Sequence, residues 1–81
     1  MQIREQIRHY IAKNFLFDEK GFSHSDTTSF LSEGIVDSIG VLELVTFVGQ
    51  EFGVNVDPAE ITPENFDSVE QIAQYVERKR G

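Results

Sequence analysis

Apolar residues recur at helical spacing in three stretches of the chain. The first stretch predicts a helix over residues 3–15, whose apolar positions are Ile3, Ile7, Tyr10, Ile11 and Phe15. The second predicts a helix from about Ser38 to Phe52. It should end at Gly53, because glycine commonly follows the last turn of a helix.

The third stretch predicts a final helix that starts within residues 67–70. Asp67 can cap its first turn, and Glu70 can reach back to complete a capping box. The apolar stripe of this helix consists of Val69, Ile72, Ala73 and Val76. The basic residues at 78–80 suit the negative end of its dipole. Before this helix, two prolines allow only short helical turns at 58–61 and 63–66.

These elements predict an all-α fold, a small four-helix bundle with three main helices and a short third helix. The chain of 81 residues is interpreted as a single domain, residues 1–81, with a thin core and little room for a deep catalytic cleft. A long polar loop separates the first two helices, and apolar residues in and just after it should pin it to the core: Phe22, Phe30, Leu31, Ile35 and Val36.

The helix over 38–52 carries more apolar residues than one buried face needs. Its core stripe is predicted to consist of Val41, Leu44, Val45, Val48 and Phe52. Ile39, Leu42 and Phe47 then fall on the outward side or its edges, together with Glu43. Either Ile39 or Leu42 packs under the 54–66 segment or the long loop, or this side docks partner proteins.

Charge is segregated along the chain, whose net charge is −7. Lysine and arginine are absent between residues 21 and 77, and that span holds eleven acids. Such a surface should repel nucleic acid and attract basic proteins, although acidity also maintains solubility. No apolar run approaches the ~20 residues of a membrane span, residues 1–15 do not resemble a signal peptide, and cysteine is absent, so a cytoplasmic protein is expected.

Ser38 stands where a helix is about to begin, which is a common place for a plain cap. A hydrolytic serine would need a base, and only His9 and His24 are present, neither in a motif. No phosphate-binding loop, zinc spacing or calcium loop appears, so no metal site is expected. A helix N-terminus favours an anion, so the hydroxyl also suits attachment of a phosphate diester.

The segment "GIVDSIGVLELV", residues 34–45, resembles the signature of acyl and peptidyl carrier proteins. The resemblance extends over essentially the whole chain. It implies that Ser38 carries 4′-phosphopantetheine, donated by coenzyme A through a phosphopantetheinyl transferase, and that Asp37 has a supporting role. The contacts to partner proteins are expected at the outward residues of the same helix: Ile39, Leu42, Glu43 and Phe47.

The resemblance implies a carrier of thioester cargo, and not an enzyme. Gly40 and Gly49 depart from the more acidic fatty-acid carriers; a glycine inside a helix indicates close approach or tolerated weakness. We therefore expect a stand-alone, monomeric carrier of an acyl or aminoacyl group. An adenylate-forming ligase would load it, and downstream acyl-transferring enzymes would unload it. The alternatives are an acidic helical adaptor without a cofactor, with Ser38 as a plain cap, and a small hydrolase that uses Ser38.

Overall fold

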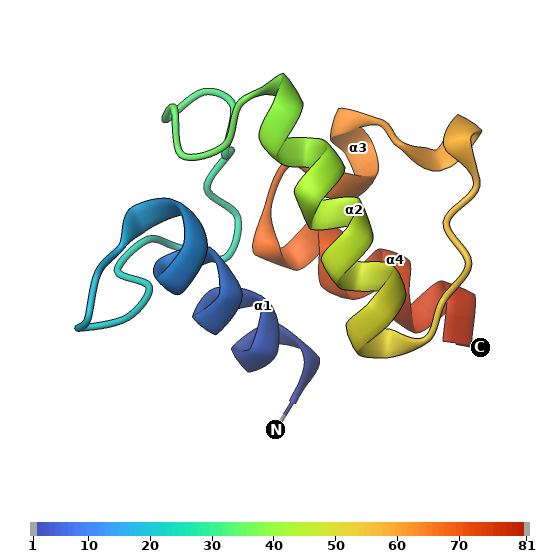
Figure 1. Cartoon of the computed structure of the whole chain (residues 1–81), viewed down its shortest axis with the longest axis horizontal. Helices are drawn as coiled ribbons and strands as arrows, with labels where there is room; N and C mark the ends of the chain where they lie inside the picture. The colour runs from blue at the N-terminus through green and yellow to red at the C-terminus, as the bar shows by residue number, and fades with distance from the viewer. Residues whose placement is uncertain (1, 81) are drawn as a thin grey trace.

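Residues 2–80 are described by a computed structural model, and their regular structure is entirely helical, as predicted (Figure 1). The three long helices are α1 (Ile3–Ile11), α2 (Ser38–Phe52) and α4 (Val69–Arg80). The π-helical segment η1 (Ala12–Leu16) continues α1, and the short elements η2 (Pro58–Glu60) and α3 (Pro63–Phe66) lie between α2 and α4. The predicted bounds of α2 and of the turn at 63–66 are confirmed, and the turn predicted at 58–61 ends one residue earlier, at Glu60.

The first helix differs from its prediction, because regular α-helix ends at Ile11 and a wider π turn follows. At its end the Phe17 N–H donates to the Ala12 carbonyl, and Phe17 adopts a left-handed conformation with φ of 52°. Phe15 and Leu16, on the widened turn, both pack partly buried against the core. Hydrophobic spacing predicted helix here but could not show the extra residue in this turn.

The core gathers side chains from every long helix and from the connection between α1 and α2. Phe30 and Val36 are 1% and 2% exposed, so two of the predicted anchors of the long loop are confirmed. Phe22 and Ile35 pack partly buried against the same cluster. The prediction for Leu31 was wrong: its side chain is 42% exposed, because the turn that carries it points outward. The loop therefore enters the core twice and exposes Leu31 in between.

The start of α4 also differs from its prediction. The capping residue is Ser68, whose hydroxyl accepts a hydrogen bond from the Gln71 N–H at 3.1 Å. Asp67 instead directs its carboxylate to the long loop, where it accepts hydrogen bonds from Ser29 and the Leu31 N–H. Glu70 is drawn to Arg4 of α1, which donates two hydrogen bonds of 2.9 and 2.7 Å. Long-range partners thus outcompete the local capping box.

Ion pairs join the basic ends of the chain to its acidic middle. Arg4 pairs with Glu70 at 2.7 Å and with Glu77 at 3.5 Å. The other two pairs are Arg8–Asp26 at 2.6 Å and Lys79–Glu60 at 3.0 Å. Within residues 2–80, the remaining acids of the middle segment have no ion pair: Glu33, Asp37, Glu43, Glu51, Asp57, Glu64 and Asp67. No helix in the described residues is long and apolar enough to cross a membrane.

Candidate functional site

The candidate site is the first turn of α2, which Asp37 caps. Asp37 has an extended backbone, and its carboxylate accepts a hydrogen bond from the Gly40 N–H at 2.7 Å. Its carbonyl accepts from the Val41 N–H at 3.0 Å. Aspartate is favoured at this position because its side chain satisfies a donor that the helix leaves open. Asp37 therefore fixes the position at which the helix begins.

Ser38 is the first residue of α2 and is exposed. Within residues 2–80, its hydroxyl makes no hydrogen bond, and the amides of Ser38 and Ile39 have no acceptor. An exposed hydroxyl beside two open helix-terminal amides fits a phosphate diester, because both the amides and the helix dipole favour an anion. Neither His9 nor His24 donates to or accepts from this hydroxyl in the described part of the chain.

Ser68 gives a direct contrast, since it also follows an aspartate at the start of a helix. Its side chain is only 4% exposed, and its hydroxyl donates to the Gln71 side chain at 3.2 Å while accepting from the Gln71 N–H. This hydroxyl is both buried and engaged in the cap, as donor and as acceptor. Of the two Asp-Ser pairs, only the pair at Ser38 leaves the serine open for chemistry.

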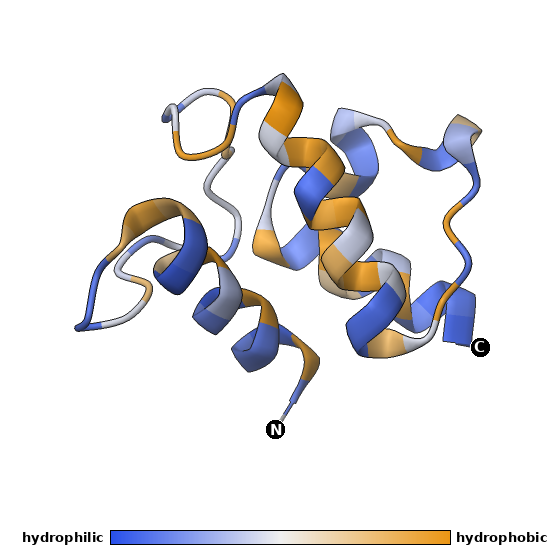
Figure 2. Ribbon diagram, viewed as in Figure 1, coloured by the Kyte–Doolittle hydropathy of each residue, from blue (hydrophilic) through white to orange (hydrophobic). Residues whose placement is uncertain are grey.

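The outward side of α2 bears exposed apolar residues next to Ser38. Ile39 is 72% exposed and Leu42 is 59% exposed, so neither packs under residues 54–66 or the long loop. Glu43 beside them is exposed as well. Figure 2 shows that hydrophobic residues occupy most of the length of α2, whereas α1 has a distinct polar side. We call Ile39, Leu42 and Glu43 the outward strip.

Phe47 lies at the edge of α2 that packs on α1, so it is not counted in this strip. Its ring stacks on Tyr10 of α1, with ring centroids 3.9 Å apart and planes 14° from parallel, and meets Phe52 edge-on. The side chain is half-buried. The helical periodicity of α2 alone could not reveal this, because the partner that covers Phe47 comes from another helix.

Gly40 lies in the first turn of α2, two residues after Ser38, where this helix meets the π-helical segment. A Cβ atom at Gly40 would lie 2.9 Å from Phe15 Cε1 and 2.9 Å from Val36 Cγ1. Both distances are shorter than real Cβ contacts, so the close approach that glycine indicated is confirmed. The sequence showed Gly40 but not its partner, because the position of Phe15 depends on the π turn.

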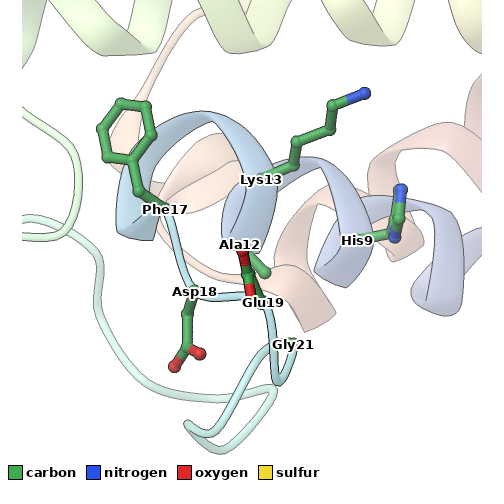
Figure 3. A pocket seen from close by; sticks show the side chains of 7 residues that line it. All are labelled: His9, Ala12, Lys13, Phe17, Asp18, Glu19 and Gly21. Carbon is green, nitrogen blue, oxygen red and sulfur yellow. The ribbon is translucent and has the colours of Figure 1, made fainter.

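A separate hollow of about 300 Å³ opens below the π-helical segment (Figure 3). Its lining comes from α1, the π-helical segment and the start of the loop, and includes His9, Lys13 and Phe17. No residue of α2 lines it, so it is not part of the site at Ser38. Among the described residues, no group of three or more His, Cys, Asp or Glu side chains is placed to hold a metal ion.

Comparison with known proteins gives the family. A family model described as "Phosphopantetheine attachment site" matches residues 5–76. A curated relative named "Probable acyl carrier protein PigG", from Serratia sp. (strain ATCC 39006), is 36% identical over 79 residues, which cover 98% of this chain and 90% of the relative. A "D-alanyl carrier protein" from Abiotrophia defectiva is 32% identical over 47 residues, 58% of this chain and 60% of the relative. These matches imply 4′-phosphopantetheine as the prosthetic group, and the chain belongs to the phosphopantetheine-binding family of carrier proteins.

Proposed function

We propose that Ser38 is the residue that carries 4′-phosphopantetheine. The observation that carries this proposal is the exposed hydroxyl of Ser38, free of hydrogen bonds within residues 2–80, at an N-terminus that Asp37 holds in place. In the transfer, Ser38 Oγ forms a bond to the β-phosphorus of coenzyme A. Adenosine 3′,5′-bisphosphate leaves with the bridging oxygen, and the transferase removes the hydroxyl proton.

Asp37 supports this reaction through the fold. Its carboxylate is engaged with the Gly40 amide, so it orients the helix start without taking the Ser38 proton. The amides of Ser38 and Ile39 then face the position that the phosphate diester would occupy. When bound, the prosthetic group supplies the thiol that holds the cargo as a thioester.

We propose that the protein is a monomeric and cytoplasmic carrier of an acyl or aminoacyl group, and that it has no catalytic activity of its own. The names of the two relatives, an acyl carrier and a D-alanyl carrier, support both cargo classes. An adenylate-forming ligase would load the thiol, and acyl-transferring enzymes would accept the cargo. Because Phe47 is packed against Tyr10, we place the partner contacts on the outward strip of Ile39, Leu42 and Glu43.

The proposal is tested by intact-mass measurement after the purified apo protein is incubated with coenzyme A and a broad-specificity phosphopantetheinyl transferase. One phosphopantetheine should be added, and peptide mapping should place it on Ser38. Ser38→Ala should gain no mass. The matched Ser68→Ala variant should still gain one phosphopantetheine, provided that its circular dichroism spectrum shows that it folds. An acidic adaptor without a cofactor would show no mass gain in any variant, and a label on Ser68 would refute the assignment.

A further inference from the structure

The segment that leads into Ser38 is long and has no regular structure, yet it must deliver the helix start to one place. Residues 17–37 contain no helix or strand. A flexible segment of this length is costly to order, so specific contacts have to hold it. Phe30 and Val36 bury their side chains, but apolar burial is not directional and does not set the orientation of the turn between them.

One residue at the junction of α3 and α4 supplies directional contacts to this turn. The Asp67 carboxylate accepts a hydrogen bond from the Ser29 hydroxyl at 2.5 Å and from the Leu31 N–H at 2.9 Å. The Asp67 carbonyl accepts from the Phe30 N–H at 2.8 Å. Ser29 in turn accepts from the Ser32 N–H at 3.1 Å. We call these contacts of Asp67 with residues 29–31 the Asp67 clamp.

The clamp is connected to Ser38 through a short run of backbone. The carbonyl of Phe30 accepts hydrogen bonds from the amides of Ile35 at 2.8 Å and Val36 at 3.3 Å. The next residue is Asp37, which caps α2. The hydrogen bonds from Ile35 and Val36 to Phe30, followed by Asp37 in the chain, therefore link the Asp67 clamp to Ser38 at the start of α2.

The clamp also determines how the turn meets solvent. Leu31 has its amide held by Asp67 while its side chain is 42% exposed, so the clamp presents an apolar side chain at a fixed point. Ser29 and Asp67 of the clamp line a solvent-open hollow together with Thr27 and Ser68. In such a hollow water competes for the hydrogen bonds, so the turn is held only while the Asp67 side chain can bond to Ser29 and Leu31.

From these contacts we propose that Asp67 is a positioning residue for the modification of Ser38. Its carboxylate holds Ser29 and Leu31 on either side of Phe30, whose carbonyl accepts from Ile35 and Val36. In this way Asp67 helps to place the first turn of α2, and the exposed Leu31, for recognition by the phosphopantetheinyl transferase. Asp67 takes no part in the chemistry. The proposal rests on the proposed attachment at Ser38.

The test measures kcat and KM for the apo protein as the substrate of a phosphopantetheinyl transferase with coenzyme A. Asp67→Ala should raise KM about tenfold, as expected for the loss of a charge-assisted hydrogen bond, while kcat changes little. Asp67→Asn should restore most of the efficiency, because its amide oxygen can accept from the Leu31 N–H and its amino group can donate to Ser29. Hydrogen exchange at the Leu31 amide should be faster in Asp67→Ala than in Asp67→Asn.

A matched control separates positioning from general loss of stability. Tyr75→Phe removes the hydrogen bond from the Tyr75 hydroxyl to Glu60 at 2.9 Å, away from the loop, and should lower stability without raising KM. A KM for Asp67→Ala equal to that of Tyr75→Phe or of the unsubstituted protein would overturn the proposal. So would an equal defect in Asp67→Asn and Asp67→Ala. If Asp67→Ala fails to fold, Ser29→Ala, which loses one contact of the clamp, should raise KM in its place, and an unchanged KM there would overturn the proposal.

Failure of the proposed function would give a different result. Modification of Ser38→Ala, or no mass gain in the unsubstituted protein, would refute attachment at Ser38. The exchange rate of the Leu31 amide would still report whether Asp67 holds the turn. Normal modification of Ser38 together with an unchanged KM in the Asp67 variants would refute the positioning role alone.

Discussion

Phe15 reaches across from the π-helical segment to the backbone of Gly40, so closely that a Cβ atom on Gly40 would lie 2.9 Å from Phe15 Cε1. This contact packs the π-helical segment against the first turn of α2, which also carries the proposed attachment residue Ser38. The close approach depends on two features together, the widened turn that carries Phe15 and the missing side chain at Gly40.

Gly40→Ala should therefore destabilise the protein, although alanine is the better helix former. Replacement of glycine inside a helix usually gains about 0.5–1 kcal/mol. Overpacking costs about 1–3 kcal/mol, so we expect a net loss of up to about 2.5 kcal/mol in the free energy of unfolding, measured by urea titration. The matched control is Gly49→Ala, whose Cβ would meet only the Val54 carbonyl at 3.4 Å and which should be neutral or stabilising. Equal gains at both positions would contradict the close approach.

The stacked pair of Tyr10 and Phe47 should act as one unit of stability between α1 and α2. Phe47→Ala and Tyr10→Ala should each destabilise the protein, and a double-mutant cycle should give a coupling of about 0.5–1.5 kcal/mol. Thermal or urea unfolding of the four proteins measures it. Phe17→Ala is the control partner, because Phe17 is 80% exposed and should add independently to Phe47→Ala. A coupling near zero for Tyr10 with Phe47 would mean that the rings do not stack in solution.

The outward strip should affect partner recognition while leaving the fold intact. Glu43→Lys and Leu42→Ala should each lower kcat/KM for phosphopantetheine transfer with little change in the helical circular dichroism signal. The Glu43 defect should shrink at high ionic strength, because it depends on charge, whereas the Leu42 defect should persist. Glu64→Lys on α3 gives the same charge change at an exposed site outside the strip. An equal effect of Glu64→Lys would indicate that only the net charge matters.

The ion pair between Arg4 and Glu70 should make stability depend on pH in the acid range. Hydrogen bonds from Arg4 lower the pKa of Glu70 to about 2, and the Arg8 guanidinium likewise lowers the pKa of Asp26. A carboxyl whose pKa is lower in the folded state contributes stability above its unfolded pKa of about 4.3, and this contribution is lost as the pH falls toward the folded value. The urea midpoint should therefore fall between about pH 5 and about pH 2.

Glu70→Gln tests this assignment because it removes the titrating group and keeps the size of the side chain. The variant should be less stable than the unsubstituted protein at neutral pH, and its midpoint should fall less steeply in acid. Glu64→Gln, which removes a carboxylate without an ion pair in residues 2–80, serves as the control and should keep the steep profile. A Glu70→Gln profile parallel to that of the unsubstituted protein would exclude Glu70 as a source of the acid sensitivity.

Helical spacing and helix-end residues predicted α2 from Ser38 to Phe52 and placed Ile39 and Leu42 outside its core stripe, although the spacing left open whether another segment covers them. These features depend on neighbours within a few residues, which the sequence displays directly. The motif around Ser38 indicated the carrier family for the same reason. What failed depended on contacts between distant segments. Glu70 left its expected cap for Arg4, 66 positions away, and Asp67 left its cap for Ser29, 38 positions away.

Phe47 shows the same limit within the candidate site. The helical spacing of α2 correctly indicated that this ring does not belong to the main core stripe, but only the position of α1 decides that Tyr10 covers it. The π turn was unpredictable on similar grounds. One extra residue in a turn leaves the apolar pattern nearly unchanged. The contact that this turn makes possible, between Phe15 and Gly40, joins residues 25 positions apart in the sequence.

The pairing of Arg4 with Glu70 and Glu77 brings the beginning of α1 beside α4. Figure 1 shows both chain ends at the lower side of the molecule, while α2 starts with Ser38 at the upper side. The 15 residues of α2 span about 22 Å at the usual helical rise, so the proposed attachment residue lies at the opposite end of α2 from the side where both chain ends lie. A domain fused to either end, or a surface on which the protein is immobilised through that end, would therefore lie away from Ser38 and leave the proposed phosphopantetheine arm accessible to a transferase.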